Sequence, residues 1–150
     1  MKIQTVGIIG AGQMGSGIAH VCALAGYDVL LTDVSQDALT AAQETIRGNM
    51  DRQVSREKIT EADRDAALER IGRTATLTDL GKSDLVIEAA TEREAVKDAI
   101  FKELVPALKP DTILTTNTSS ISITRLASKT DRPEKFMGFH FMNPVPIMSL

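Results

Sequence analysis

The chain has 150 residues, of which 43% are hydrophobic and 25% are charged, and its formal net charge is −3. The length fits one domain of globular composition, and the acidic balance with only 3% aromatic residues argues against a nucleic-acid-binding surface. No apolar run approaches the roughly 20 residues that a membrane-spanning helix needs. The first predicted strand begins so close to Met1 that we expect no leader peptide and a cytoplasmic protein.

A glycine-rich turn dominates the first part of the chain. An apolar run over residues 6–9 leads into the spacing G-x-G-x-x-G at Gly10, Gly12 and Gly15, and a helical pattern follows. Gly10 permits a tight turn, Gly12 leaves room for a pyrophosphate, and Gly15 lets the helix pack closely on its strand. The helix start, with Gln13 and Met14, offers unpaired N–H groups to phosphates. The pattern predicts a dinucleotide-binding loop.

A second apolar run, residues 28–32, ends in Asp33, which lies 18 residues after Gly15. An acidic residue near that spacing hydrogen-bonds the adenosine ribose in dinucleotide-binding folds. The alternative is a glycine-rich turn in an unrelated α/β protein, and the position of Asp33 argues against it. Since a carboxylate repels a 2′-phosphate and neither Val34 nor Ser35 is positively charged, we expect NAD rather than NADP.

Two long helices are predicted between Asp33 and the third strand. Ser35 is an expected N-cap of the first, whose apolar stripe reaches Met50 before a polar, mixed-charge stretch over residues 49–58. A capping box at residues 60–63 begins the second helix, and Gly72 is placed to end it. Such a pair is longer than a plain crossover requires, so we expect a helical hairpin that projects from the sheet.

The rest of the chain continues the alternation of strands and helices. Further strands are predicted at residues 75–77, 84–90, 112–116 and 136–141. Further helices are predicted from a Thr91–Glu94 capping box to Leu104 and over residues 123–128. The alternation predicts an α/β fold of the Rossmann type, with a doubly wound, mostly parallel sheet.

Two residues of potential chemical interest are interpreted as structural. Cys22 is the only cysteine, so an internal disulfide or a cysteine metal cluster is excluded, and no metal site is predicted. It lies among apolar residues of the first helix, so we interpret it as a small core residue rather than as a reactive thiol. His20, in the same helix, is interpreted as a core histidine.

Four sequence blocks occur in an order that resembles the 3-hydroxyacyl-CoA dehydrogenases, most closely the small bacterial 3-hydroxybutyryl-CoA dehydrogenases. The pattern reads G-x-G-x-M-G-x-G-I-A, then D-L-V-I-E-A-A-x-E, N-T-S-S-x-S-I-T and G-x-H-F-x-N-P-x-P. The blocks lie at residues 10–19, 84–92, 117–124 and 138–146. They are spread in order across essentially the whole chain, from residue 10 to residue 146, and together they are far more specific than any one of them.

The resemblance implies roles for individual residues. Beyond the glycine loop and Asp33, the implied NAD contacts are Glu92, Lys97, Asn117, Ser119 and Asn143. Ser119 would hydrogen-bond the substrate oxygen at the reacting carbon, and His140 would be the catalytic base. The hairpin between residues 43 and 71 resembles a coenzyme A clamp, in which Arg52 and Arg56 are candidates for the CoA phosphates.

Elementary chemistry agrees with these two catalytic roles. Oxidation of a secondary alcohol needs a base for the hydroxyl proton, and an imidazole with a pKa of about 6.5 suits that task near neutral pH. Ser119 and His140 both fall at the carboxyl ends of predicted strands, where ligands bind in open α/β sheets. The alternative for His140 is a core histidine between Phe139 and Phe141.

The sequence departs from the family pattern at its end. The family places a glutamate partner of the histidine, a further asparagine and a helical dimerisation domain after the position of Leu150. We therefore interpret residues 1–150 as the dinucleotide-binding domain, expect the longer form to be a homodimer acting on an acyl-CoA, and expect little activity from this chain alone. Glu88 is not assigned as the missing partner, because its motif matches a different position. Two alternatives stay open: a dehydrogenase of a free hydroxy acid, and an NAD-binding module without turnover.

Overall fold

A six-stranded parallel sheet forms the centre of the computed structural model, which describes residues 2–90, 93–117 and 130–139. The strand order is β3-β2-β1-β4-β5-β6, and every neighbouring pair is parallel. The strands are β1 (Thr5–Ile9), β2 (Asp28–Thr32), β3 (Ile71–Thr74), β4 (Leu85–Glu88), β5 (Ile113–Asn117) and β6 (Phe136–Phe139). The order reverses between β1 and β4, and such a switch point opens a crevice at the carboxyl ends of the strands.

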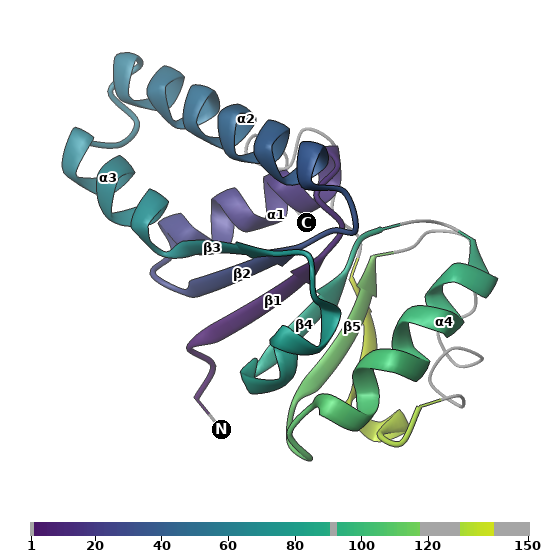
Figure 1. Cartoon of the computed structure of the whole chain (residues 1–150). Helices are drawn as coiled ribbons and strands as arrows, with labels where there is room; N and C mark the ends of the chain where they lie inside the picture. The colour runs from purple at the N-terminus through teal and green to yellow at the C-terminus, as the bar shows by residue number, and fades with distance from the viewer. Residues whose placement is uncertain (1, 91–92, 118–129, 140–150) are drawn as a thin grey trace.

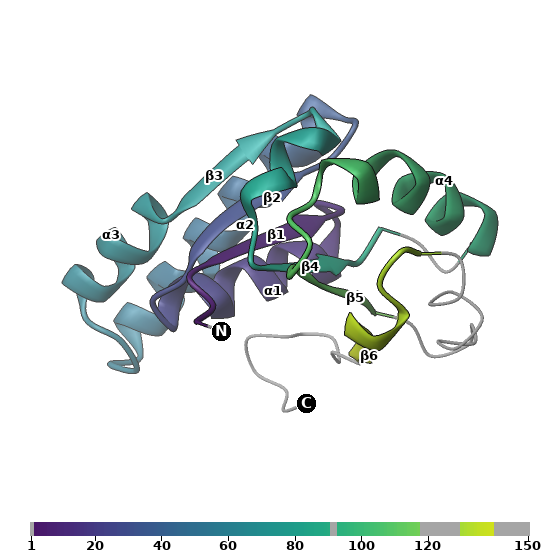
Figure 2. The same ribbon diagram turned by 90° about the horizontal axis from the view of Figure 1, so that it is seen from below.

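Helices cover both faces of the sheet (Figures 1 and 2). The α-helices are α1 (Gln13–Leu24), α2 (Gln36–Ser55), α3 (Glu61–Glu69) and α4 (Glu94–Leu104). Three 3-10 helices, η1 (Leu77–Lys82), η2 (Val105–Ala107) and η3 (Pro133–Lys135), complete the described elements. Helices α1, α2 and α3 pack together on one face, and α4 packs with η1 on the other. The predicted Rossmann-type, doubly wound fold is confirmed.

The core consists of two apolar layers separated by the sheet. On one side, Val6 and Ile8 of β1 join residues of α1 and α2, whereas Ile9 joins Phe101 and Leu104 of α4 on the other. Burial of both faces explains why the strands read as continuous apolar runs rather than as alternating ones. None of the helices in the described ranges is long and apolar enough to cross a membrane.

The predicted hairpin is formed by α2 and α3. The Ser35 hydroxyl accepts from the N–H of Ala38 at 3.1 Å, and Thr60 and Asp63 form a complete capping box at the start of α3. Helix α2 runs through the polar stretch as far as Ser55 and is therefore longer than its apolar stripe. Figure 1 shows the far end of the hairpin beyond the amino ends of the strands.

The region after α3 differs from the prediction. Helix α3 ends at Glu69, before Gly72, and the strand lies at residues 71–74 instead of 75–77. The reason is tertiary: Ile71 pairs with Val29 of β2 and packs against the core, which pulls this segment into the sheet. The following residues form η1, which buries Leu80.

The start of α4 also differs. The helix begins at Glu94, with Arg93 at the N-cap position and no capping hydrogen bond from its side chain. The predicted capping box makes Thr91 the N-cap and Glu94 the third helical residue; Glu94 is instead the first helical residue, and Thr91 lies outside the described residues. The helix predicted over residues 123–128 also lies outside them.

Candidate functional site: the crevice beside the glycine loop

A groove of about 440 Å³ lies where the strand order reverses, at the carboxyl ends of β1, β2 and β4. Its lining joins the glycine loop, the turn after β2, the segment before η1, the turn after β4 and one side of α4. The lining residues are Ile9, Gly10, Thr32, Asp33, Val34, Ala75, Thr76, Leu77, Ala90, Val96, Ile100 and Glu103. This is the position at which open α/β sheets bind their ligands.

Each glycine of the loop meets a different steric requirement. Gly10 has a φ of +104°, and a Cβ there would lie 2.7 Å from the Cα of Ala90. A Cβ at Gly15 would lie 1.6 Å from the carbonyl oxygen of Gly10, so only glycine lets α1 approach the loop this closely. A Cβ at Gly12 would meet nothing within 4 Å, so the space above this residue is open. The three positions therefore give a tight turn, a close helix approach and free space beside the backbone.

The start of α1 can receive an anion in that free space. Gly12 is its N-cap residue and provides no side-chain capping bond, and the first turn contains no acidic residue. The first N–H groups of a helix lack intrahelical partners and carry the positive end of its dipole. Gln13 is exposed and Met14 half-buried, while the hydroxyl of buried Ser16 donates to the Ala11 carbonyl at 3.2 Å. These groups fit a pyrophosphate.

Asp33 lines the groove and is also bound to the glycine loop. Its Oδ2 accepts from the N–H of Ala11 at 2.9 Å, and its Oδ1 accepts from the N–H of Ser35 at 2.9 Å. A carboxylate has about four acceptor positions, so about two remain for other donors such as ribose hydroxyls. The spacing rule predicts the ribose contact but contains nothing about Ala11, which the fold brings to Asp33.

The rest of the groove has an apolar character suited to a nucleobase. Leu77, Val96 and Ile100 belong to its lining, and Val34 at its rim is 95% exposed. Among the described residues that line the groove there is no lysine or arginine, and Glu103 adds a second carboxylate. A 2′-phosphate would therefore be repelled by these carboxylates, with no cation among the described lining residues to offset the repulsion. A 2′-hydroxyl carries no charge and would not be repelled.

Lys97, an implied NAD contact, lies in a buried polar cluster with Glu88 and Thr116. The Lys97 ammonium donates to Glu88 Oε1 and, at 3.0 Å, to Thr116 Oγ1, and all three residues are 0% exposed. Thr116 Oγ1 also donates to Glu88 Oε1 at 2.6 Å, and Glu88 Oε2 accepts from the N–H of Ala90 at 2.7 Å. One feature of the sequence indicates such a cluster. Glu88 ends a strand that is otherwise apolar, and a buried carboxylate needs a partner.

The other residues predicted at this edge are only partly described. Asn117 is half-buried at the end of β5 and pairs with Phe139 at the end of β6. Both strands therefore end at the same edge of the sheet. Glu92, Ser119, His140 and Asn143 lie outside the described residues.

The two arginines predicted for the CoA phosphates lie far from the groove. Both Arg52 and Arg56 are exposed near the far end of the hairpin, and the Arg52 guanidinium donates to Asn49. Arg52 lies 17 positions after the N-cap Ser35 along α2, a distance of about 25 Å at 1.5 Å per residue. Only an extended ligand could reach both ends of α2.

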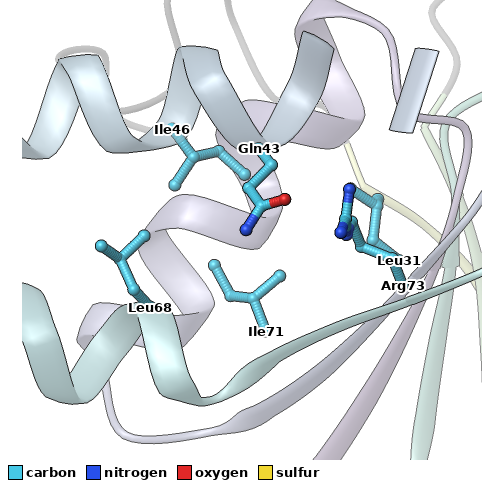
Figure 3. A pocket seen from close by; sticks show the side chains of 6 residues that line it. All are labelled: Leu31, Gln43, Ile46, Leu68, Ile71 and Arg73. Atoms are coloured by element: carbon cyan, nitrogen blue, oxygen red, sulfur yellow. The ribbon is translucent and has the colours of Figure 1, made fainter. Parts of the chain in front are cut away.

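A separate small cavity lies between the hairpin and the edge of the sheet (Figure 3). It has a volume of about 20 Å³ and is lined by Leu31, Gln43, Ile46, Leu68, Ile71 and Arg73. Figure 3 shows the Gln43 amide pointing into it from α2, above Ile71. A space of this size holds about one water molecule, so it is a packing gap and not part of the groove.

The surroundings of His20 and Cys22 indicate structural roles for both residues. His20 is fully buried in α1, and its Nε2 shares a 2.7 Å hydrogen bond with Gln53 Oε1 of α2. Burial lowers the pKa of His20 below its ordinary value, although the bond to Gln53 opposes this shift. Burial also raises the pKa of the Cys22 thiol to about 11, which keeps it protonated at neutral pH.

Comparisons with known proteins agree with this geometry. Residues 5–150 match the family described as "3-hydroxyacyl-CoA dehydrogenase, NAD binding domain". A 3-hydroxybutyryl-CoA dehydrogenase from Bradyrhizobium diazoefficiens is 60% identical over 148 residues, which cover 99% of this chain and 50% of that protein. A 3-hydroxyadipyl-CoA dehydrogenase from Escherichia coli is 46% identical over 150 residues, which cover 100% of this chain and 32% of that protein.

A solved structure gives the same result in three dimensions. The crystal structure of an (S)-3-hydroxybutyryl-CoA dehydrogenase from Ralstonia eutropha matches with a TM-score of 0.96 and 46% identity, covering 99% of this chain and 53% of that one. The chain thus spans about half the length of these 3-hydroxybutyryl-CoA dehydrogenases. On the family match and the glycine-loop geometry together, this chain belongs to the 3-hydroxyacyl-CoA dehydrogenase family, as its NAD-binding domain.

Proposed function

We propose that the chain provides the cofactor site and two catalytic residues, Ser119 and His140, of an oxidoreductase. This enzyme would interconvert a 3-hydroxyacyl-CoA and a 3-oxoacyl-CoA. The observation that carries the proposal is the groove at the switch point, which Asp33 lines and whose glycine loop is open at Gly12 and donates the Ala11 N–H to the Asp33 carboxylate. The name of the 60% identical relative favours 3-hydroxybutyryl-CoA as the substrate.

NAD is the cofactor of this family, and the pyrophosphate, the adenosine ribose and the adenine each have a candidate binding group in or beside the groove. The N–H groups at the start of α1 would bind the pyrophosphate, and the free acceptor positions of Asp33 would bind the ribose hydroxyls. The apolar side chains of Leu77, Val96 and Ile100 would contact the adenine. When bound, NAD supplies the hydride acceptor for oxidation of the alcohol.

The proton chemistry is assigned to residues at the ends of β5 and β6. We propose that His140 takes the hydroxyl proton of the substrate and that Ser119 donates a hydrogen bond to the reacting oxygen. Support comes from the resemblance of their motifs and from the pairing of Asn117 with Phe139, which brings these two strands to one edge. Glu92, Lys97, Asn117 and Asn143 remain proposed cofactor contacts on the resemblance alone.

Recognition of coenzyme A is assigned to the hairpin. Arg52 and Arg56 are exposed cations near its far end, where they could pair with phosphates. Because the hairpin extends about 25 Å from the Asp33 end of α2, an acyl-CoA could lie along it with its acyl group at the crevice. The homodimer expected for a longer form also remains a proposal.

An NAD-binding module without turnover is the second candidate. It is favoured by one observation: every group assigned to the dinucleotide above lies within residues 1–150. The family pattern places the carboxylate partner of the histidine further along. Without such a partner, His140 would be a weaker and less well oriented base.

Calorimetry with NADH and a steady-state assay with acetoacetyl-CoA and NADH test the two candidates on one preparation. Binding with turnover supports the oxidoreductase, and binding without turnover supports the module. Absence of NADH binding contradicts both. In an active form, His140→Gln and Ser119→Ala should lower kcat by about 10²–10⁴. The His140 variant should bind NADH almost normally, and normal turnover in this variant would identify His140 as a core histidine.

A further inference from the structure

The buried cluster of Glu88, Lys97 and Thr116 links three elements just below the cofactor groove. Glu88 ends β4, Lys97 lies in the first turns of α4, and Thr116 is the penultimate residue of β5. All three are 0% exposed. Burying an ion pair takes two charges out of water and seldom gains stability over apolar residues of similar size. Stability alone is therefore a weak explanation for this cluster.

The two oxygens of Glu88 have different partners. Oε1 accepts from Lys97 and Thr116, which fixes the carboxylate against α4 and β5. Oε2 accepts from the backbone N–H of Ala90 at 2.7 Å, so the fixed carboxylate in turn holds the turn that follows β4. A carboxylate that is anchored on one side and accepts a backbone N–H on the other is a rigid positioning element.

The Ala90 peptide lies directly against the glycine loop. A Cβ at Gly10 would be 2.9 Å from the nitrogen of Ala90 and 2.7 Å from its Cα. The neighbouring Ala89 N–H donates to the Ile9 carbonyl at 2.8 Å, which ties the same turn to the end of β1. Gly10 and Ala90 also both line the groove. A shift of the Ala90 peptide would therefore change the position of Gly10 and the shape of the groove.

We propose that Glu88 is a positioning residue for the dinucleotide site, because its carboxylate, anchored by Lys97 and Thr116, holds the Ala90 peptide against Gly10. This inference rests on the NAD site proposed above and adds a residue that does not line the groove. The role needs an acceptor at position 88 that faces Ala90. It does not need a negative charge at that position, provided that Lys97 is not left as an uncompensated buried cation.

A matched pair of double variants compares a side chain at position 88 that has polar groups for Ala90 and Thr116 with one that has none. In Glu88→Gln with Lys97→Met, the amide oxygen can still accept from Ala90, and its NH2 can donate to the Thr116 hydroxyl. In Glu88→Met with Lys97→Met, a side chain of similar length provides no comparable acceptor. Neither variant buries an unpaired charge, and Lys97 is absent from both, so any direct contact of Lys97 with NADH cancels in the comparison.

The affinity for NADH is measured by calorimetry at a temperature where both variants are folded, and amide hydrogen exchange is measured at Ala90 without NADH. We expect the methionine variant at position 88 to bind NADH at least tenfold more weakly than the glutamine variant and to exchange the Ala90 amide faster. Equal affinities would overturn the positioning role, whatever the exchange rates. Equal exchange rates would show that the side chain at position 88 does not hold Ala90, and would also overturn it. If the unaltered protein binds no NADH, the proposed function fails, while the exchange comparison still tests whether position 88 holds the turn.

Discussion

Replacing Gly15 with alanine tests how closely α1 packs on the glycine loop. The new Cβ would lie 1.6 Å from the Gly10 carbonyl oxygen, whereas ordinary contact begins at 3.4 Å. The difference of about 1.8 Å must be taken up by backbone movement, because the atoms that would clash are backbone atoms of the loop. Overpacking of this kind costs about 1–3 kcal/mol, which corresponds to a fall in melting temperature of roughly 2–12 °C for a chain of this size.

The same substitution should weaken cofactor binding. Moving the start of α1 by 1–2 Å displaces the N–H groups that would bind the pyrophosphate, and displacements of about 1 Å can cost about 100-fold where positioning matters. We expect Gly15→Ala to bind NADH roughly 10–100-fold more weakly, measured by calorimetry well below its melting temperature. A variant that melts and binds like the unaltered protein would refute the close packing.

Two other glycines provide matched controls. At Gly12 a Cβ meets nothing within 4 Å, so Gly12→Ala should stay folded while its methyl group occupies the space for the pyrophosphate and weakens NADH binding at least tenfold. At Gly48, within α2, the nearest atom would be a terminal nitrogen of Arg52 at 4.0 Å. Gly48→Ala should therefore stabilise the protein by about 0.5–1 kcal/mol without changing the NADH affinity. Unchanged NADH binding by folded Gly12→Ala would contradict the pyrophosphate assignment.

Three further predictions concern charge and pH. Asp33→Ser should weaken NADH binding and reduce the preference for NADH over NADPH, and equal binding of both by the unaltered protein would remove the basis of this argument. The pKa of Asp84 is lowered from 3.8 to about 2 by hydrogen bonds from Lys109 and from the N–H groups of Gln4 and Thr5. The stability it contributes is thus present above pH 4 and lost as the pH falls towards 2, so urea unfolding of Asp84→Asn should depend less on pH in this range. Burial lowers the pKa of His20 below 6.5, so protonation of this residue favours the unfolded chain. The free energy of unfolding should therefore decline as the pH falls below 6.5, and His20→Gln should reduce that decline. An unchanged slope in either variant would show that another group titrates there.

The sequence determined the features that depend on local rules. Gly10 adopts the positive φ that the turn requires, and Ser35, Thr60 and Asp63 form the caps that their spacing predicts. The strands β1, β2 and β5 coincide closely with their apolar runs. Each of these depends on residues within a few positions of one another, so a single sequence contains the information.

Only the tertiary structure decided the features that depend on distant partners. Residues 71–74 became a strand because they pair with β2, whereas the local pattern continued the helix to Gly72. Asp33 holds Ala11 across 22 positions, and Glu88 meets Thr116 across 28, because parallel strands bring their carboxyl ends to one edge. The anchored carboxylate beside the glycine loop therefore depends on the order of the strands in the sheet, which no local motif contains.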